Sequence, residues 1–458
     1  MYNAQPETAN TEGISLHELI KALQKAHQLV VYRGLLQDHV VKSYLCLLEA
    51  LISYPPAVPT INNAYHDFVH NLIMKETPGK WPDAWQRYLV SAILADENPF
   101  SRQAEHVSFQ EISPNLIEAA RHDLACLQQM FQTSSRSIRK VAIERMSREM
   151  ENCDSISLLS WEAMSSGQDS PVDSMVLFNS DHWENDIEAV AAYYRAHGTG
   201  IFQRFHAFRW EKRGDEGCLT GISRPDAVNP GELIGLQRQR EALETNTRYF
   251  LAGLPASHVL LYGPRGTGKT TMVKSLLNAY SDRGLRIIEL PKQHLSDLPA
   301  IFNLLCNRAL RFIIFVDDLS FEDYEVDYKV LKTVLEGGIE RRPDNVLIYA
   351  TSNRRHIVKE MFSDRAAEEM HGGDSVQEKL SLADRFGMTI TFPYPSERSY
   401  LEIVRGLAAR YHIDLSDDEL VKRALQWEKS HSGPSGRTAR QFVDHLVAEA
   451  GLKRGKQK

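Results

Sequence analysis

The sequence predicts an α/β protein with a parallel five-stranded sheet, a mostly α-helical N-terminal domain before it and a small helical domain after it. Short runs rich in β-branched residues alternate with helical segments in the second half, which is typical of parallel strands joined by crossover helices. The first two hundred residues instead place apolar residues three and four apart, which indicates helices. We expect a helical region over 1–212, a linker over 213–232, an α/β core over 233–393 and a helical lid over 394–458.

Composition and length favour an ordinary globular protein of two or three domains. The chain has 458 residues, of which 43% are apolar and 25% charged. Its N-terminus lacks the basic patch and apolar core of a signal peptide, and no run approaches eighteen apolar residues, so we expect a cytoplasmic protein with no membrane span. The five cysteines are an odd number without C-x-x-C spacing, which argues against disulfides and cysteine zinc sites.

The formal charge of −7 is unevenly distributed. Residues 1–220 carry 19 Lys+Arg against 28 Asp+Glu, a net −9, and residues 221–458 carry 34 against 32, a net +2. A protein that binds nucleic acid along its whole surface is usually basic. The net charges of the two parts therefore do not indicate a nucleic-acid partner, although a local basic patch for one stays possible.

The helical region is interrupted where Pro, Gly and Ser break the apolar period. These breaks are PPAVP (55–59), TPGKWP (77–82) and SSGQDSP (165–171). A turn-rich stretch, RGDEGCLTGISRPDAVNPGE, then gives the predicted linker.

Five strands are predicted beyond the linker, each followed by a longer helical or polar segment. They are HVLLY (258–262), RIIEL (286–290), RFIIFV (311–316), NVLIYAT (345–351) and MTITF (388–392). The strands stop after about residue 395, where the pattern becomes helical. Ser416 and Glu419 there have the spacing of a capping box.

A phosphate-binding loop is the strongest functional signal. The segment from Gly263 to Thr270 fits G-x-x-x-x-G-K-[ST] and lies between a predicted strand and a predicted helix, as this motif requires. Glycines let backbone amides turn toward a phosphate, Lys269 supplies a positive charge for the β- and γ-phosphates, and Thr270 reaches Mg²⁺. The predicted nucleotide contacts are Gly263, Pro264, Arg265, Gly266, Thr267, Gly268, Lys269, Thr270 and Thr271.

Two carboxylates follow the buried strand RFIIFV. Burying Asp317 and Asp318 side by side is costly unless a cation lies near them. We assign Asp317, with Thr270, to the Mg²⁺ shell and Asp318 to polarising the attacking water. The sequence therefore predicts ATP and Mg²⁺ as cofactors and ATP hydrolysis as the reaction.

In motif order and spacing, residues from about 190 to 450 resemble AAA+ ATPases. More narrowly, LIGLQRQREAL, LLYGPRGTGKTT, FVDDLSFE, LKTVLEGG, ATSNRRH, EKLSLADRFG and SGRTARQF are similar to an uncharacterised bacterial AAA+-like ATP-binding family, domain of unknown function 815. This resemblance implies an ATPase core. It does not imply a substrate.

Further site residues follow from the resemblance. Asn353 matches the polar "sensor 1" that orients the attacking water, and Thr351 or Ser352 takes that role if the register slips. Arg437 resembles the "sensor 2" arginine that contacts the γ-phosphate, with Arg440 as the alternative.

The resemblance also implies an adenine contact and an arginine that acts on a neighbouring subunit. Ile234 and Gly235 match the segment that packs on adenine, and a plain turn is the alternative. Arg385 precedes the fifth core strand, where AAA+ proteins carry an arginine that reaches the ATP of the next copy. The alternative is a local salt bridge from Arg385 to Asp384 or Glu378.

Three uses of ATP stay open. One is a remodelling or loading ATPase, a homo-oligomer with ATP sites at subunit interfaces whose N-terminal region holds an unknown protein or nucleoprotein client. The second is a slowly hydrolysing switch, and the third is a DNA-associated initiator or helicase loader. The segment PKQHLSDLP after RIIEL lacks the aromatic-apolar-glycine loop of threading unfoldases, so direct peptide threading is disfavoured.

Overall fold

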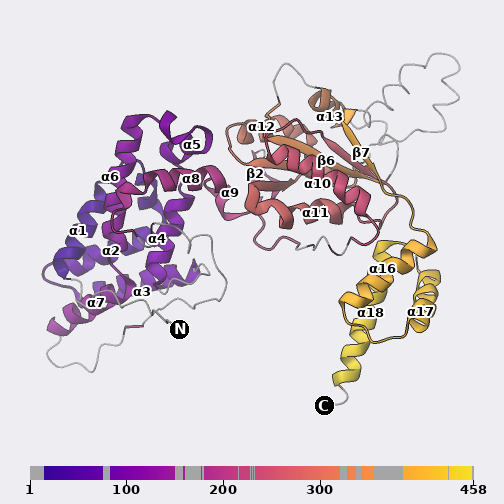
Figure 1. Ribbon diagram of the computed structural model, residues 1–458. Coiled ribbons are helices and arrows are strands. Elements are labelled where there is room, and N and C mark those ends of the chain that lie inside the picture. Colours follow the sequence, from indigo (N-terminus) through magenta and orange to yellow (C-terminus); the bar gives the residue numbers. More distant parts are fainter. Residues whose placement is uncertain are drawn as a thin grey trace, which may run out of the picture. The chain divides into compact units, whose positions relative to one another are not determined.

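The computed structural model forms two compact units, Met1–Gln203 and Arg204–Lys458 (Figure 1). The structure describes residues 15–75, 83–149, 158–159, 177, 180–214, 216–226, 228, 231, 233–319, 327–336, 342–353, 385–431 and 433–455. The division falls before the predicted linker, 213–232. The reason is that residues 207–213, just after the division, already belong to the sheet of the second unit.

The N-terminal unit contains helices and no strand among its described residues. Its α-helices are α1 (Leu16–His27), α2 (His39–Ile52), α3 (Val58–Met74), α4 (Ala84–Ala95), α5 (Pro99–His106), α6 (Pro114–Phe131), α7 (Ser135–Glu149) and α8 (Ile187–His197), and α9 (Ile201–Arg204) leads into the next unit. At its centre, buried Trp85 stacks on Tyr44 with ring centroids 4.0 Å apart. Within the described segments, neither unit has a helix of the length and apolarity that crossing a membrane requires.

The second unit is built on a mostly parallel sheet with the strand order β2-β1-β4-β5-β6-β3-β7. The strands are β1 (Ala207–Arg213), β2 (Glu216–Gly221), β3 (Val259–Tyr262), β4 (Leu285–Glu289), β5 (Arg311–Val316), β6 (Val346–Ser352) and β7 (Met388–Thr391). Among the strands of the described residues, only β1 and β2 pair antiparallel. The expected α/β class with a parallel sheet is thus confirmed.

The predicted number of five strands is wrong, because the sheet has seven. β1 and β2 occupy residues for which the sequence predicted the end of the helical region and the linker. The glycines of EGCLTG suggested turns, but they face aromatic rings: a Cβ at Gly217 would lie 2.0 Å from the Trp210 ring, and one at Gly221 would lie 2.3 Å from Phe205. A glycine inside a strand marks such a close approach as readily as it marks a turn.

Helices cover both faces of this sheet and explain its apolar strands. α10 (Gln237–Leu251) and α11 (Lys269–Tyr280) bury one side each in an apolar cluster with β3, β4, β5 and β6. Figure 1 shows α12 (Leu298–Leu305) and α13 (Asp327–Glu336) on the other side of the sheet. Because both faces are covered, every residue of β6 is buried.

Three helices form the lid at the C-terminal end of this unit. They are α16 (Glu397–Arg410), α17 (Asp417–Ser430) and α18 (Gly436–Gly455), and they share a separate apolar core around Tyr400, Ala424 and Phe442. The start of α18 meets the α/β core directly, since the Arg437 backbone N–H donates to the Gly266 oxygen at 3.2 Å.

Candidate functional site

The loop between β3 and α11 has a backbone that only glycine adopts readily. Gly263, Gly266 and Gly268 have φ values of 153°, 76° and 96°. At Gly263 a side chain is also excluded by space, because a Cβ would lie 2.1 Å from the Phe392 backbone oxygen. Gly268 then ends the loop in the left-handed region, and α11 begins at Lys269 with its amide groups toward the loop.

Lys269 is held inside the loop by three acceptors. Its Nζ donates to the Gly263 oxygen at 2.7 Å, the Pro264 oxygen at 2.8 Å and Asn353 Oδ1 at 3.0 Å. Burial lowers the pKa of Lys269. An anion at this position would therefore gain a close, partly dehydrated positive charge.

The two carboxylates that follow β5 contact groups from three other segments. Thr270 Oγ1 donates to Asp317 Oδ1 at 2.8 Å. Asp318 Oδ1 accepts a hydrogen bond from Asn353 Nδ2, and Asp318 Oδ2 lies 3.8 Å from Arg265 Nη2. The ends of β5 and β6, the phosphate loop and α11 thus converge, at the edge where parallel sheets bind ligands.

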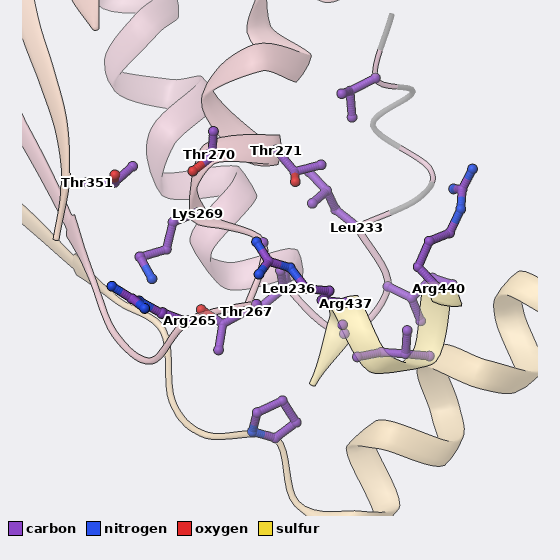
Figure 2. Close-up of a pocket in the computed structure, with 18 of the residues that line it drawn as sticks. Leu233, Leu236, Arg265, Thr267, Lys269, Thr270, Thr271, Thr351, Arg437 and Arg440 are labelled. Carbon is purple, nitrogen blue, oxygen red and sulfur yellow. The ribbon is translucent and has the colours of Figure 1, made fainter. Parts of the chain in front are cut away.

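Thr351 connects the same two carboxylates from the end of β6. Its hydroxyl donates to Asp317 Oδ1 at 2.5 Å and accepts the Asp318 backbone N–H at 2.9 Å. Figure 2 shows Thr351 beside Thr270 and Lys269.

A cavity of about 770 Å³ lies over the loop and extends to the lid. Its apolar wall contains Val228, Leu233, Ile234, Leu236, Ile403 and Leu407. Ile234 packs so closely on α16 that a Cβ at Gly406 would lie 2.5 Å from Ile234 Cδ1. The cavity therefore has a polar end that fits phosphates and an apolar end that fits a flat ring system.

Two lid arginines line this cavity and differ in direction. Figure 2 shows the Arg437 side chain extending toward the phosphate loop, and Arg440 pointing away from it. Arg440 is also engaged locally, with Nε 3.1 Å from Asp444 Oδ1 and its guanidinium 5.1 Å from the centre of the Tyr411 ring. The geometry favours Arg437 over Arg440 as the lid cation nearest a phosphate.

The oxygen donors at the loop fit a magnesium ion bound together with a phosphate. Mg²⁺ usually takes one or two protein oxygens, several waters and substrate phosphates. Thr270 Oγ1 and Asp317 Oδ1 provide such a pair. Elsewhere, the described parts of the chain contain no group of three or more His, Cys, Asp or Glu side chains placed to hold a metal by themselves.

Residues 203–450 match the model of a family described as protein of unknown function (DUF815). The chain belongs to this family. Curated relatives of this chain include the Holliday junction branch migration complex subunit RuvB of Prochlorococcus marinus, 26% identical over 212 residues, which are 44% of this chain and 56% of the relative. The 26S proteasome regulatory subunit 6B homolog of Encephalitozoon cuniculi is 24% identical over 217 residues, 44% of this chain and 54% of the relative.

These curated relatives are matched over only about half of their own length. Together with the motifs they support an AAA+ family of P-loop NTPases for this chain. Two solved structures of Thermotoga maritima RuvB align with TM-scores of 0.36 and 0.31 at 16% and 17% identity. They cover 50% and 48% of this chain and 67% and 71% of RuvB.

Most residues that the sequence proposed for the site lie around one cavity. Those lining it are Ile234, Gly235, Arg265, Gly266, Thr267, Gly268, Lys269, Thr270, Thr271, Asp317, Asp318, Asn353 and Arg437. Gly263 and Pro264 do not line it, but their backbone oxygens accept from Lys269.

Arg385 lies at the other end of the sheet from this cavity. β7 runs parallel to β3, with Met388 opposite Val259, so Arg385 precedes the amino ends of both strands. It is exposed and does not line the cavity. Asp384 and Glu378, its alternative partners, are outside the described residues.

Sequence reasoning named Thr351 only as an alternative and missed most of the apolar wall. In ATSN the strand register decides which polar side chain faces the carboxylates, and a one-residue shift reverses the face. Leu233, Leu236, Ile403 and Leu407 carry no motif, because apolar residues at these spacings are typical of any packed helix or turn.

Proposed function

We propose that this protein is an AAA+-type ATPase that binds ATP with Mg²⁺ and hydrolyses it to ADP and phosphate. The contact between Thr270 and Asp317 carries this proposal, since it brings a hydroxyl and a carboxylate to one point beside Lys269. When bound, the ion would neutralise charge on the β- and γ-phosphates. Asp318 would polarise the attacking water, and Asn353 would hold Asp318 through its side-chain amide.

The remaining contacts would be divided between the core and the lid. Ile234 and Gly235 would pack on adenine, and the loop from Gly263 to Thr271 would enclose the phosphates. Arg437 would approach the γ-phosphate from the lid. Because a bound nucleotide would touch both the loop and α18, its hydrolysis would change how the lid is held.

Such a change suits an ATPase that remodels or loads a partner. We propose a homo-oligomer in which Arg385 of one copy serves the ATP of the next, and in which the N-terminal helical unit holds a protein or nucleoprotein client. The names of the relatives refer to a Holliday junction in one case and to the proteasome in the other. Similarity therefore does not decide between nucleic acid and protein as the client.

A slowly hydrolysing switch is the second candidate. It is favoured by Asp318, whose shorter side chain stands where related ATPases commonly have Glu and which adopts a left-handed φ of 52°. An ATPase rate that never responds to any partner would favour the switch over the remodelling enzyme.

Replacing Lys269 by Ala tests the nucleotide site. The change removes a charged hydrogen-bond donor, so we expect ATP affinity to fall about 10- to 100-fold in titration calorimetry. Lys274→Ala is the matched control, because Lys274 lies on the same helix with its amine on Asp226 at 3.2 Å and does not line the cavity. Equal ATP affinity in the two variants would exclude the proposed site.

A further inference from the structure

Thr351 lies where the two central strands of the sheet end. It is the penultimate residue of β6 and only 2% exposed. β6 pairs with β5 on one side, with Ala350 opposite Val316, and with β3 on the other, with Thr351 itself opposite Leu261. Neighbours on both sides therefore fix its position.

The single hydroxyl of Thr351 serves both carboxylate residues in one defined direction. Because its proton is donated to Asp317 Oδ1, its lone pair is available to accept the Asp318 N–H. The Thr351 backbone oxygen also accepts the Leu319 N–H at 2.7 Å. One residue thus holds three successive residues after β5.

This hold matters most at Asp318. With a φ of 52°, Asp318 adopts a left-handed conformation that residues other than glycine rarely take. Such conformations persist where surrounding contacts determine them. The hydrogen bond from the Asp318 N–H to Thr351 is a partly buried contact of this kind, and it sets the direction in which the Asp318 side chain leaves the backbone.

Asp317 depends on the same hydroxyl. Thr270 and Thr351 donate to one oxygen of Asp317, from α11 and β6 respectively. Two donors from different elements leave the carboxylate little freedom to rotate. The two hydrogen bonds to Oδ1 therefore also fix the direction of the second oxygen, Oδ2.

We propose that Thr351 is the positioning residue of the hydrolytic site, aiming Asp317 at the magnesium shell and Asp318 at the attacking water. This inference rests on the proposed ATPase function. It assigns Thr351 no contact with ATP. Loss of the hydroxyl should therefore impair turnover and the response to Mg²⁺ much more than ATP binding.

Thr351→Val tests the proposal, because valine keeps the shape of threonine and removes only the two hydrogen bonds of the hydroxyl. Small misplacements of catalytic groups cost up to about 100-fold in rate, so we expect kcat to fall about 10- to 100-fold. We also expect a higher Mg²⁺ concentration for half-maximal rate and a KM for ATP within about threefold of wild type. Thr351→Ser, which keeps the hydroxyl, should restore most of kcat.

Thr247→Val is the matched control. Thr247 is a fully buried threonine of the same unit whose hydroxyl bonds to the Leu243 oxygen at 2.8 Å and to the Tyr349 hydroxyl at 2.9 Å, and it does not line the cavity. If Thr351→Val does not fold, Thr351→Ala replaces it, since it also removes the hydroxyl.

Three kinetic results would overturn the inference. They are an unchanged kcat without the hydroxyl, a serine variant as slow as the valine variant, and an equal loss of kcat in Thr247→Val. Wild-type protein that binds ATP but does not hydrolyse it would instead contradict the ATPase proposal itself. A loss of ATP affinity equal to that of Lys269→Ala would make Thr351 part of the binding site and would also overturn its positioning role.

Discussion

Asp318 combines an uncommon backbone conformation with contacts to three other residues of the candidate site. Its backbone is left-handed, its N–H is held by Thr351, and its side chain contacts Asn353 and Arg265. The pair with Arg265 is largely exposed, at 79% and 55% of the two side chains, so it adds little to stability. Its effect is on where the carboxylate points.

Residues whose type is dictated by chemistry were predictable from the sequence. A glycine turn followed by Lys269 and Thr270 serves phosphate binding in only one spacing. The expected burial of Asp317 and Asp318 is wrong, because both lie exposed just past the end of β5, so burial alone does not require a cation beside them. Asn353 and Arg437 line the cavity, and both were named only because the sequence resembles AAA+ ATPases. Thr351 could not be separated from Ser352, because that choice depends on strand register.

At the scale of elements, the imidazole of His258 links β3 to β6. His258 Nδ1 accepts the Ile348 N–H at 2.8 Å, and Arg342 contacts Nε2. Burial, with the Arg342 charge as a second cause, lowers the pKa of His258 from 6.5 to about 3. The folded sheet therefore holds a neutral imidazole.

This depressed pKa predicts a loss of stability in mild acid. Because the unfolded chain binds a proton near pH 6.5 and the folded one does not, the stabilisation is complete above pH 6.5. It falls by about 1.4 kcal/mol per pH unit as the pH drops toward 3. The free energy of opening of the Ile348 amide, from hydrogen exchange at pH 7 and pH 5, should decrease by about 2 kcal/mol.

His258→Asn provides the comparison, since its amide oxygen can still accept the Ile348 N–H but does not titrate. We expect the decrease at pH 5 to be much smaller in this variant. An equal decrease in both proteins would assign the acid sensitivity to other groups.

Elements with a clear period were predicted better than those without one. β3 to β6 carry the apolar runs that burial on both faces demands. β7 lies at one edge of the sheet and buries Ile390 alone, yet its apolar run was also recognised. β1 and β2 lie at the other edge, where alternation of charged and aromatic residues suffices, and the glycines that fit Trp210 and Phe205 resembled turn residues. The helices after residue 395 were predicted from their apolar period. At the start of α17, the Glu419 backbone N–H donates to Ser416 Oγ at 3.4 Å.

At the scale of the whole molecule, the position of Arg385 concerns assembly. It precedes the amino end of β7, whereas the phosphate loop follows the carboxyl end of the parallel strand β3. If Arg385 serves an ATP site, that site belongs to another copy.

Subunit mixing tests this prediction. Arg385→Ala should bind ATP and lose hydrolysis, because the charge opposite the γ-phosphate is missing. Mixed with Lys269→Ala, it should regain part of the activity, since some interfaces then combine an intact loop with an intact arginine. Absence of any recovery, under conditions where a fluorescence assay shows subunit exchange, would count against a shared site.

The role of the N-terminal unit was the least predictable property. Its helices follow from apolar spacing, but its buried polar groups serve packing: Asp123, for example, accepts the backbone N–H groups of Val30, Val31 and Tyr32. A binding surface needs no fixed motif, so the client that we propose for this unit has no signature in the sequence.

The central claim is that this protein hydrolyses ATP at the Asp317–Asp318 site. Phosphate release from Mg²⁺-ATP by wild type and Asp318→Asn tests it most directly, because asparagine tolerates the left-handed backbone and removes only the charge. The account predicts steady release by wild type, and in the variant normal ATP affinity with release at least about tenfold slower. Equal release by the two proteins, or none from wild type at any protein concentration, would contradict it.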